Sequence, residues 1–122
     1  MKRSLWRHVV PCSLAAFFVL GGTLNFFASE DILSDYQRWG YPGWFHYVTA
    51  MLEWVAALLL AIPATRIYGS LLGCALMFAA GGTVLIHGEY DHALPPLVVL
   101  MLLVLNLFIV TRTKRRKGGV GA

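Results

Sequence analysis

Charged residues divide the chain into long apolar segments. Residues 8–29, 67–88 and 92–111 contain no Asp, Glu, Lys or Arg, and residues 39–65 contain only Glu53. An α-helix rises about 1.5 Å per residue, so about 20 apolar residues suffice to cross the hydrocarbon layer of a membrane. The pattern therefore predicts four transmembrane helices, at about 9–28, 44–62, 67–86 and 94–111, followed by a basic tail at 112–122.

The first connection, residues 29–43, carries a pattern of its own. Its apolar residues recur at helical spacing and oppose its charged residues, which is typical of a short amphipathic helix lying in the membrane interface. The apolar set is Ile32, Leu33, Tyr36 and Trp39, and the charged set is Asp31, Asp35 and Arg38. Gly40 and Pro42 are expected to end this helix.

The composition supports the same interpretation. Hydrophobic residues make up 58% of the 122 residues, against roughly 45–50% in soluble domains. Four spans would use nearly the whole chain. We therefore expect an all-α fold in which residues 1–122 form a single domain, a four-helix transmembrane bundle of up-down-up-down topology with a short interfacial helix in the first outer loop.

The distribution of basic residues predicts the orientation. Lys and Arg favour the cytoplasmic side of a membrane, and nine of the ten, all except Arg38, flank the predicted spans on one side. Both termini are therefore expected in the cytoplasm, with the protein in the plasma or inner membrane. The net charge of +4 is explained by topology and by attraction to anionic lipid, so no nucleic-acid partner is expected.

A secretory signal peptide is the alternative for the first segment, with cleavage after Ala28. Phe26 stands where such a site needs a small residue, and the apolar run is longer than a typical signal core. We expect the segment to be retained as a helix.

Glu53 is the only charged side chain within the predicted spans. An ionised carboxylate is costly at that depth, so Glu53 should face other helices or a wet cavity, and removal from water favours its neutral form. Small residues share its helix face, as they do on two other helices, which is typical of close packing between membrane helices. The three faces are His46, Ala50, Glu53, Ala57 and Ala61; Gly69, Gly73, Leu76, Ala80, Thr83 and His87; and Ala15, Phe18, Gly22 and Asn25.

These faces predict a pocket that is open toward the outer side. Glu53 would form its floor, and Asn25, His46, Thr83 and His87 would form its rim. Two interpretations of Glu53 stay open: a ligand site, or a protonated side chain that only holds helices together by a hydrogen bond. Trp39 and Trp44 lie at the same edge, either as ligand-stacking side chains or as part of an aromatic belt at headgroup depth.

Other chemistry has weaker support. The segment 87–92 contains four potential metal ligands, but its two histidines are five residues apart, which fits no common zinc spacing. We therefore predict a solvated loop and no metal site. No CxxC, phosphate-binding glycine loop or serine triad pattern occurs in the sequence, so catalytic residues cannot be assigned and enzymatic activity stays undecided. Asn106 is expected to form a hydrogen bond between helices.

Four short segments and the helix of Glu53 resemble one family. The segments are GGTLN at 21–25, WGYP at 39–42, IPATR at 62–66 and HGE at 87–89. In this order they resemble the DoxX-like proteins, small four-span membrane proteins, over roughly residues 10–112. Many relatives carry Lys where this chain has Asn25, and that difference removes a cationic partner for Glu53.

The resemblance implies a link to redox systems of the membrane. Relatives are linked to thiosulfate:quinone oxidoreductase or terminal quinol oxidase complexes, to hydroquinone resistance and to oxidative-stress defence. It implies a site for a quinone or a similar apolar molecule, which would be the sole bound cofactor, in an accessory of such a system. The expected partners are the lipid bilayer and either a redox-complex subunit, another membrane protein or a second copy. The alternative is a non-enzymatic membrane scaffold that stabilises another membrane protein.

Overall fold

The computed structural model describes the backbone of residues 2–121 and the side chains of residues 8–112. This part of the chain is all α, without a strand. Two short 3-10 turns, Pro63–Thr65 and Tyr90–Ala93, precede the last two helices. The five α-helices are α1 (Lys2–Phe26), α2 (Glu30–Arg38), α3 (Phe45–Ala61), α4 (Arg66–Ile86) and α5 (Leu94–Gly121).

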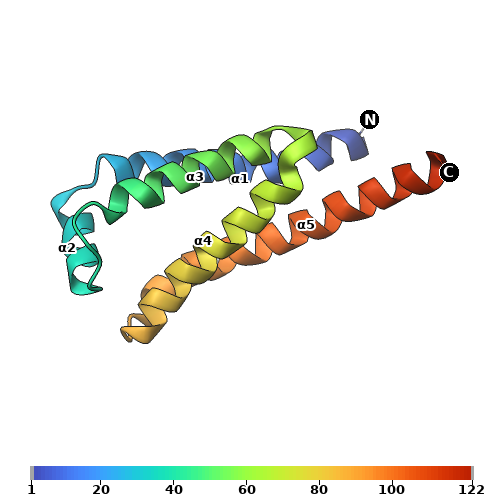
Figure 1. Cartoon of the computed structure of the whole chain (residues 1–122). Helices are drawn as coiled ribbons and strands as arrows, with labels where there is room; N and C mark the ends of the chain where they lie inside the picture. The colour runs from blue at the N-terminus through green and yellow to red at the C-terminus, as the bar shows by residue number, and fades with distance from the viewer. Residues whose placement is uncertain (1, 122) are drawn as a thin grey trace.

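The four long helices lie side by side and reverse direction from one to the next (Figure 1). The closest packing joins α1 to α3 and α4 to α5, and α3 also packs on α4. α1 begins and α5 ends at the same end of the molecule, and α2 lies at the opposite end (Figure 1). The order of the elements therefore places the connection between α1 and α3, which contains α2, and the connection between α4 and α5 at one end.

All four predicted long helices are present, with different bounds. Three contain segments long and apolar enough to cross a membrane, namely His8–Phe26, Pro63–Ile86 and Tyr90–Arg112, whereas α3 is apolar but shorter, with 17 residues. α1 begins seven residues before the predicted start, and α5 continues through most of the basic tail predicted at 112–122. The apolar segment ends at Thr111. Lys and Arg are good helix formers, so α5 continues beyond that segment into the basic tail.

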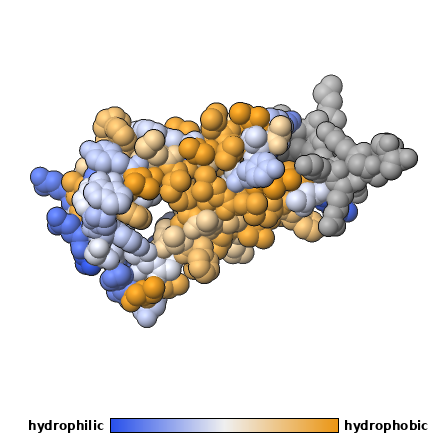
Figure 2. All heavy atoms as spheres, in the orientation of Figure 1, coloured by the Kyte–Doolittle hydropathy of each residue, from blue (hydrophilic) through white to orange (hydrophobic). Residues whose placement is uncertain are grey.

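The outer surface of the long helices is apolar. Figure 2 shows hydrophobic residues over the middle of the molecule and polar residues gathered at the end that carries α2. Large side chains such as Phe78, Ile86 and Met101 are exposed on this surface. A continuous apolar surface of this kind fits contact with lipid rather than water.

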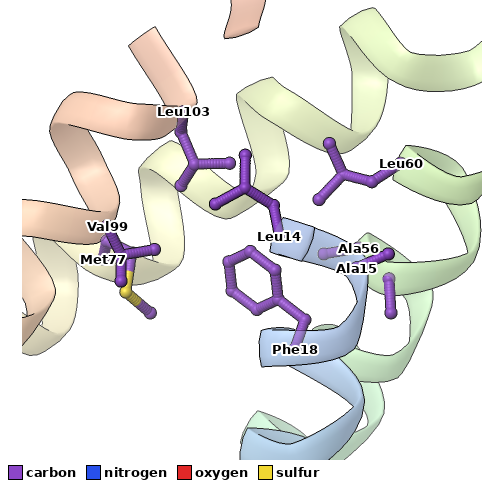
Figure 3. Close-up of a cluster of buried hydrophobic side chains, with 9 residues drawn as sticks. Leu14, Ala15, Phe18, Ala56, Leu60, Met77, Val99 and Leu103 are labelled. Atoms are coloured by element: carbon purple, nitrogen blue, oxygen red, sulfur yellow. The ribbon is translucent and has the colours of Figure 1, made fainter. Parts of the chain in front are cut away.

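The core lies where all four long helices meet. Phe18 of α1 is fully buried and extends toward Met77, Val99 and Leu103 of α4 and α5, while Leu60 lies on the side of α3 (Figure 3). Gly73 makes room for this ring and for Leu103, because a Cβ there would lie 3.1 Å from Phe18 Cζ and 2.9 Å from a methyl carbon of Leu103. A single aromatic side chain therefore joins the two helix pairs.

Asn106 forms the expected bond between helices. Its Nδ2 donates to the hydroxyl of Ser70 at 2.9 Å, and both residues are buried. The bond connects α5 to α4 in a region where lipid offers no hydrogen-bonding partner. This prediction from the sequence is confirmed.

The turn between α3 and α4 supplies donors to the end of α3. Ile62 is extended, Pro63 opens the 3-10 turn, and the Thr65 hydroxyl donates to the Leu59 carbonyl at 2.8 Å. Arg66 is buried, and its Nε donates to the Leu60 carbonyl at 2.8 Å while its Nη1 lies 2.9 Å from His8 Nδ1. These bonds satisfy carbonyls that a helix end otherwise leaves without partners.

The helix predicted in the first outer loop is also present as α2. Ser29 caps it, since its hydroxyl accepts from the Ile32 amide at 3.3 Å. Gly40 follows with a φ of +85°, a conformation that glycine adopts without strain, and the chain turns toward α3. α2 and the residues after it carry the aromatic side chains of the candidate site.

Gly69 and Gly82 of α4 form a matched pair for testing close helix packing. A Cβ on Gly69 would lie 2.7 Å from the backbone nitrogen of Leu60, whereas a Cβ on Gly82 would meet nothing within 4 Å. We expect Gly69→Ala to destabilise the protein by about 1–3 kcal/mol, because backbone of α3 cannot yield as a side chain does.

Gly82→Ala should leave thermal stability in detergent unchanged or raise it, because alanine forms helix better than glycine. Unfolding of both variants, followed by circular dichroism, is the measurement. Equal stability of the two variants would contradict this packing of α3 on α4.

Candidate functional site

Glu53 lies between α3 and α1 and is buried. Its Oε2 accepts a hydrogen bond from Asn25 Nδ2 at 2.9 Å. Gly21 leaves the space that the carboxylate fills, because a Cβ on Gly21 would lie 3.0 Å from Glu53 Oε1. The sequence predicted Glu53 and Asn25 to share an interior space, and the structure brings them into direct contact.

Asn25 extends this contact to α2. Its Oδ1 accepts from the hydroxyl of Tyr36 at 2.8 Å, and its Nδ2 also donates to the Gly21 carbonyl at 3.0 Å. A chain of hydrogen bonds thus runs from Glu53 through Asn25 to Tyr36, across three helices. The pKa of Tyr36 is raised, first by burial and also by the charge of Glu53, so the phenol keeps its proton at neutral pH.

Glu89 fastens α2 to the connection between α4 and α5. It forms an ion pair with Arg38, and its Oε2 accepts from Trp39 Nε1 at 2.6 Å. Gly88, with a φ of +72°, allows the turn that brings Glu89 to this position. The bond from Trp39, followed by the charge of Arg38, holds the pKa of Glu89 below its usual value, so this contact is present at neutral pH.

Tyr41 makes a second connection across the same end. Its hydroxyl lies 2.7 Å from Thr83 Oγ1 on α4. Its ring stacks on Phe45, with centroids 4.4 Å apart and an angle of 6° between the planes. Tyr41 therefore ties the entry of α3 to the outer end of α4.

Two cavities adjoin Tyr36 and Tyr41. An open groove of about 680 Å³ lies between the end of α1, α2 and the start of α3, and His46 lines it. A second, more enclosed cavity of about 400 Å³ lies between α2, α3, α4 and the start of α5. Figure 2 shows a hollow where the polar end meets the apolar surface.

Aromatic and small apolar side chains line most of the second cavity. Polar groups lie mainly at its α2 end, where Arg38 and Trp39 meet Glu89, and at Thr83. We refer to it as the α2–α4 cavity. Its lining residues are Asp35, Tyr36, Arg38, Trp39, Tyr41, Phe45, Thr49, Leu52, Leu76, Ala79, Ala80, Thr83, Val84, His92 and Pro96.

Glu53, Asn25 and His87 lie outside both of these cavities. Glu53 and Asn25 form the buried hydrogen-bonded pair between α3 and α1 instead. His87 is exposed, and its Nδ1 lies 2.8 Å from the Thr83 carbonyl of its own helix, away from Glu53. Counting at helical spacing from Thr83 puts His87 on the same face of α4. The helix ends at Ile86, however, so this count no longer determines where the His87 side chain lies.

The remaining predicted residues lie at the same end but apart from one another. Trp39 and Thr83 line the α2–α4 cavity, and His46 lines the open groove. Trp44 is exposed at the start of α3 and lines neither, which is the position expected of a residue in an aromatic belt. The predicted site is therefore divided between a buried pair and two separate cavities.

Sequence reasoning missed Tyr36, Tyr41 and Glu89 as site residues. The sequence pattern placed Tyr36 only on the apolar side of the predicted interfacial helix, and Tyr41 only in the WGYP segment that carries the family resemblance. The residue spacing of α2 shows that Tyr36 and Trp39 share a face, which was the available signal. No local signal in the sequence pairs Arg38 with Glu89, because 51 positions separate them.

Within residues 8–112, no group of three or more His, Cys, Asp or Glu side chains could hold a metal ion. The four potential ligands of segment 87–92 are thus not gathered around one point. That the protein has no metal site stays a prediction.

Comparison with known proteins gives one match. A model of the DoxX-like family matches residues 9–106, which include all of α2, α3 and α4 and parts of α1 and α5. No curated protein and no solved structure matches the chain.

Substitution of Glu53 tests whether the buried pair needs a charge or only a hydrogen bond. In Glu53→Gln the side-chain oxygen can still accept from Asn25, so we expect stability close to that of the wild type. Glu53→Leu removes the acceptor and should cost about 1 kcal/mol, the usual size of a bond between membrane helices.

Thermal unfolding in detergent measures both variants, with Val55→Leu on the exposed face of α3 as the control. A loss in Glu53→Gln as large as in Glu53→Leu would show that the carboxylate itself is required for stability.

Proposed function

The chain belongs to the DoxX-like family, and on this premise we propose that it is a four-span membrane protein that binds a small apolar ring molecule. The site is the α2–α4 cavity, and the ligand class is a quinone or a molecule of similar shape. The protein would serve as an accessory of a membrane redox or oxidative-stress system, as the family resemblance implies.

Four spans require α3 to cross the membrane as well. Its 17 residues measure about 25 Å, against roughly 30 Å for the hydrocarbon layer. Ile62 and Trp44 extend the apolar length at its two ends, and a bilayer can thin locally around a short helix at modest cost. The close packing of α3 on α1 and α4 supports the same placement.

The two ends of the molecule support an orientation with both termini in the cytoplasm. Basic residues surround the beginning of α1 and the end of α5, which lie at one end. Acidic residues Glu30, Asp31, Asp35 and Glu89 lie at the other end, with α2. This asymmetry follows the rule that Lys and Arg stay on the cytoplasmic side, and we place α2 in the outer interface of the plasma or inner membrane.

The α2–α4 cavity carries the binding proposal. Its volume of about 400 Å³ falls within the range of roughly 300–1,000 Å³ for small-molecule sites. Tyr36, Trp39, Tyr41 and Phe45 offer aromatic surface on one side, and Ala79 and Ala80 of α4 leave room on the other. An apolar chamber with few polar groups at one end is the usual form of a site for a ring molecule.

Reporter fusions test the proposed topology. At Gly118, a reporter that works only in the cytoplasm should be active. At Asp35 in α2, a reporter that works only outside the cytoplasm should be active. Insertion after Gly43, in the loop before α3, serves as a second outer position. The same side for Gly118 and for the two outer positions would overturn the four-span arrangement.

A variant that fills the α2–α4 cavity tests the binding site. In Ala80→Phe the added ring occupies the cavity, whereas in Ala75→Phe it extends from an exposed position of the same helix that lines neither cavity. We expect the first variant to weaken binding of 1-naphthol and of 2,3-dimethyl-1,4-naphthoquinone at least tenfold, and the second to have no effect.

Equilibrium binding to the protein in lipid nanodiscs is the measurement, with empty nanodiscs to correct for partitioning into lipid. Failure of both compounds to bind above that background would overturn the proposed site. The chain would then be better described as a scaffold for another membrane protein.

A further inference from the structure

The hydroxyl protons around the α2–α4 cavity can be traced individually. Thr83 Oγ1 lies 2.8 Å from the Ala79 carbonyl and 2.7 Å from the hydroxyl of Tyr41. A carbonyl oxygen can only accept, so the single proton of Thr83 goes to Ala79. The Tyr41 hydroxyl must then donate its own proton to Thr83, and its oxygen keeps only the capacity to accept.

The same reasoning applies to Tyr36. Asn25 Nδ2 lies 3.0 Å from the Gly21 carbonyl and 2.9 Å from Glu53 Oε2. The carbonyl accepts in any protonation state of Glu53, so the amide nitrogen of Asn25 is held on that side and its Oδ1 faces Tyr36. Tyr36 therefore donates its proton to Asn25 at 2.8 Å, and its oxygen too can only accept.

Two further donors of the lining, those of Trp39 and Thr49, are used in the same way. The Trp39 indole N–H donates to Glu89, and the Thr49 hydroxyl donates to the Phe45 carbonyl at 3.2 Å. Arg38 pairs with Asp35 and Glu89. Arg38 and His92 are both exposed, so water competes for the remaining N–H groups of Arg38 and for the ring of His92.

We propose that the α2–α4 cavity selects a ring molecule that donates a hydrogen bond, such as a phenol or a hydroquinone, over one that only accepts, such as a quinone. The proposal rests on the proposed binding function and specifies its ligand. A donor hydroxyl meets the oxygen of Tyr36 or Tyr41, which can accept a hydrogen bond but has no proton left to donate. A carbonyl at the same place meets two oxygen atoms without a proton between them, which is repulsive.

Glu53 acquires a positioning role in this arrangement. It does not touch the cavity, but together with Gly21 it fixes the direction of the Asn25 amide and so the direction of the Tyr36 hydroxyl. The raised pKa of Tyr36 keeps its proton in place. The buried pair therefore affects ligand choice through Tyr36.

A set of probes with one ring system tests the proposal. 1-Naphthol donates a hydrogen bond, and 1-methoxynaphthalene has the same rings but no donor. 2,3-Dimethyl-1,4-naphthoquinone only accepts. Its methyl groups block the ring carbons to which the thiols of Cys12 or Cys74 could add. In phosphatidylcholine nanodiscs, we expect 1-naphthol to bind about tenfold more tightly than either other probe, corrected for partitioning, which is the usual effect of one hydrogen bond.

Thr83→Val tests the direction of the bonds. It removes the acceptor of Tyr41, so the Tyr41 proton becomes free to donate into the cavity, and affinity for the quinone relative to 1-naphthol should rise several-fold. Thr23→Val is the matched control, because Thr23 is exposed on α1, donates to the Val19 carbonyl and lines neither cavity. Should Thr83→Val fail to fold, Tyr41→Phe replaces it, and the expected result is a reduced preference for 1-naphthol over 1-methoxynaphthalene.

The outcomes separate this inference from the proposed function. Equal binding of 1-naphthol and 1-methoxynaphthalene, weakened for both by Ala80→Phe, overturns the selection of donors and leaves the binding site intact. Tighter binding of the quinone does the same. A preference for 1-naphthol that neither Thr83→Val nor Tyr41→Phe changes also overturns it, while no binding of any probe overturns both proposals.

Discussion

Satisfaction of buried polar groups within the protein is the constraint on which the rest of this structure depends. Lipid offers no hydrogen-bonding partner, so each polar side chain between the long helices must find one in the chain. Glu53 meets Asn25, Ser70 meets Asn106, and Arg66 meets the last carbonyls of α3. Among the side chains of residues 8–112, no buried nitrogen or oxygen lacks a partner. These contacts join α1 to α3 and α4 to α5 or α3, and they fix how the apolar faces pack around Phe18.

The end of the molecule that carries α2 is held together differently. No residue of α2 is buried, and hydrogen bonds attach it to its neighbours: Tyr36 to Asn25 on one side, Arg38 and Trp39 to Glu89 on the other. An element held by a few polar contacts above an apolar bundle leaves space beneath it, and the α2–α4 cavity occupies that space. The cavity thus results from the way α2 is attached, and it is bounded by the residues that attach it.

The sequence predicted the helices well because their pattern is local. Apolar runs between charges gave the existence of all four long helices, helical spacing gave α2, and the small residues of α4 included Gly69, which lies against the backbone of Leu60. Glu53 and Asn25 were expected to face one interior space, and they do, because both lie on predicted helices whose residue spacing gives the face of each side chain. The predicted helix bounds were less accurate where a helix continues past its apolar segment, as at the end of α5.

The candidate site was harder to predict because its geometry depends on loops. His87 follows the helical count of α4 but lies just after the helix has ended, so the count no longer places its side chain. Glu89 and Arg38 meet only because Gly40 and Gly88 turn the chain at positive φ. Which side chains face the cavity is decided by these turns, and no periodic pattern encodes them.

The two interpretations of Glu53 that the sequence left open need not exclude each other. Its bond to Asn25 has the geometry of a contact that holds helices together, and neither described cavity reaches it. Yet Glu53 and the Gly21 carbonyl both accept from the Asn25 amide nitrogen, so that the Asn25 Oδ1 faces the hydroxyl of Tyr36, a residue that lines both cavities. In a membrane protein this small, two hydrogen bonds connect a polar group buried for packing to a residue that lines the proposed binding cavity. A packing contact can therefore determine the polarity of a site without being part of it.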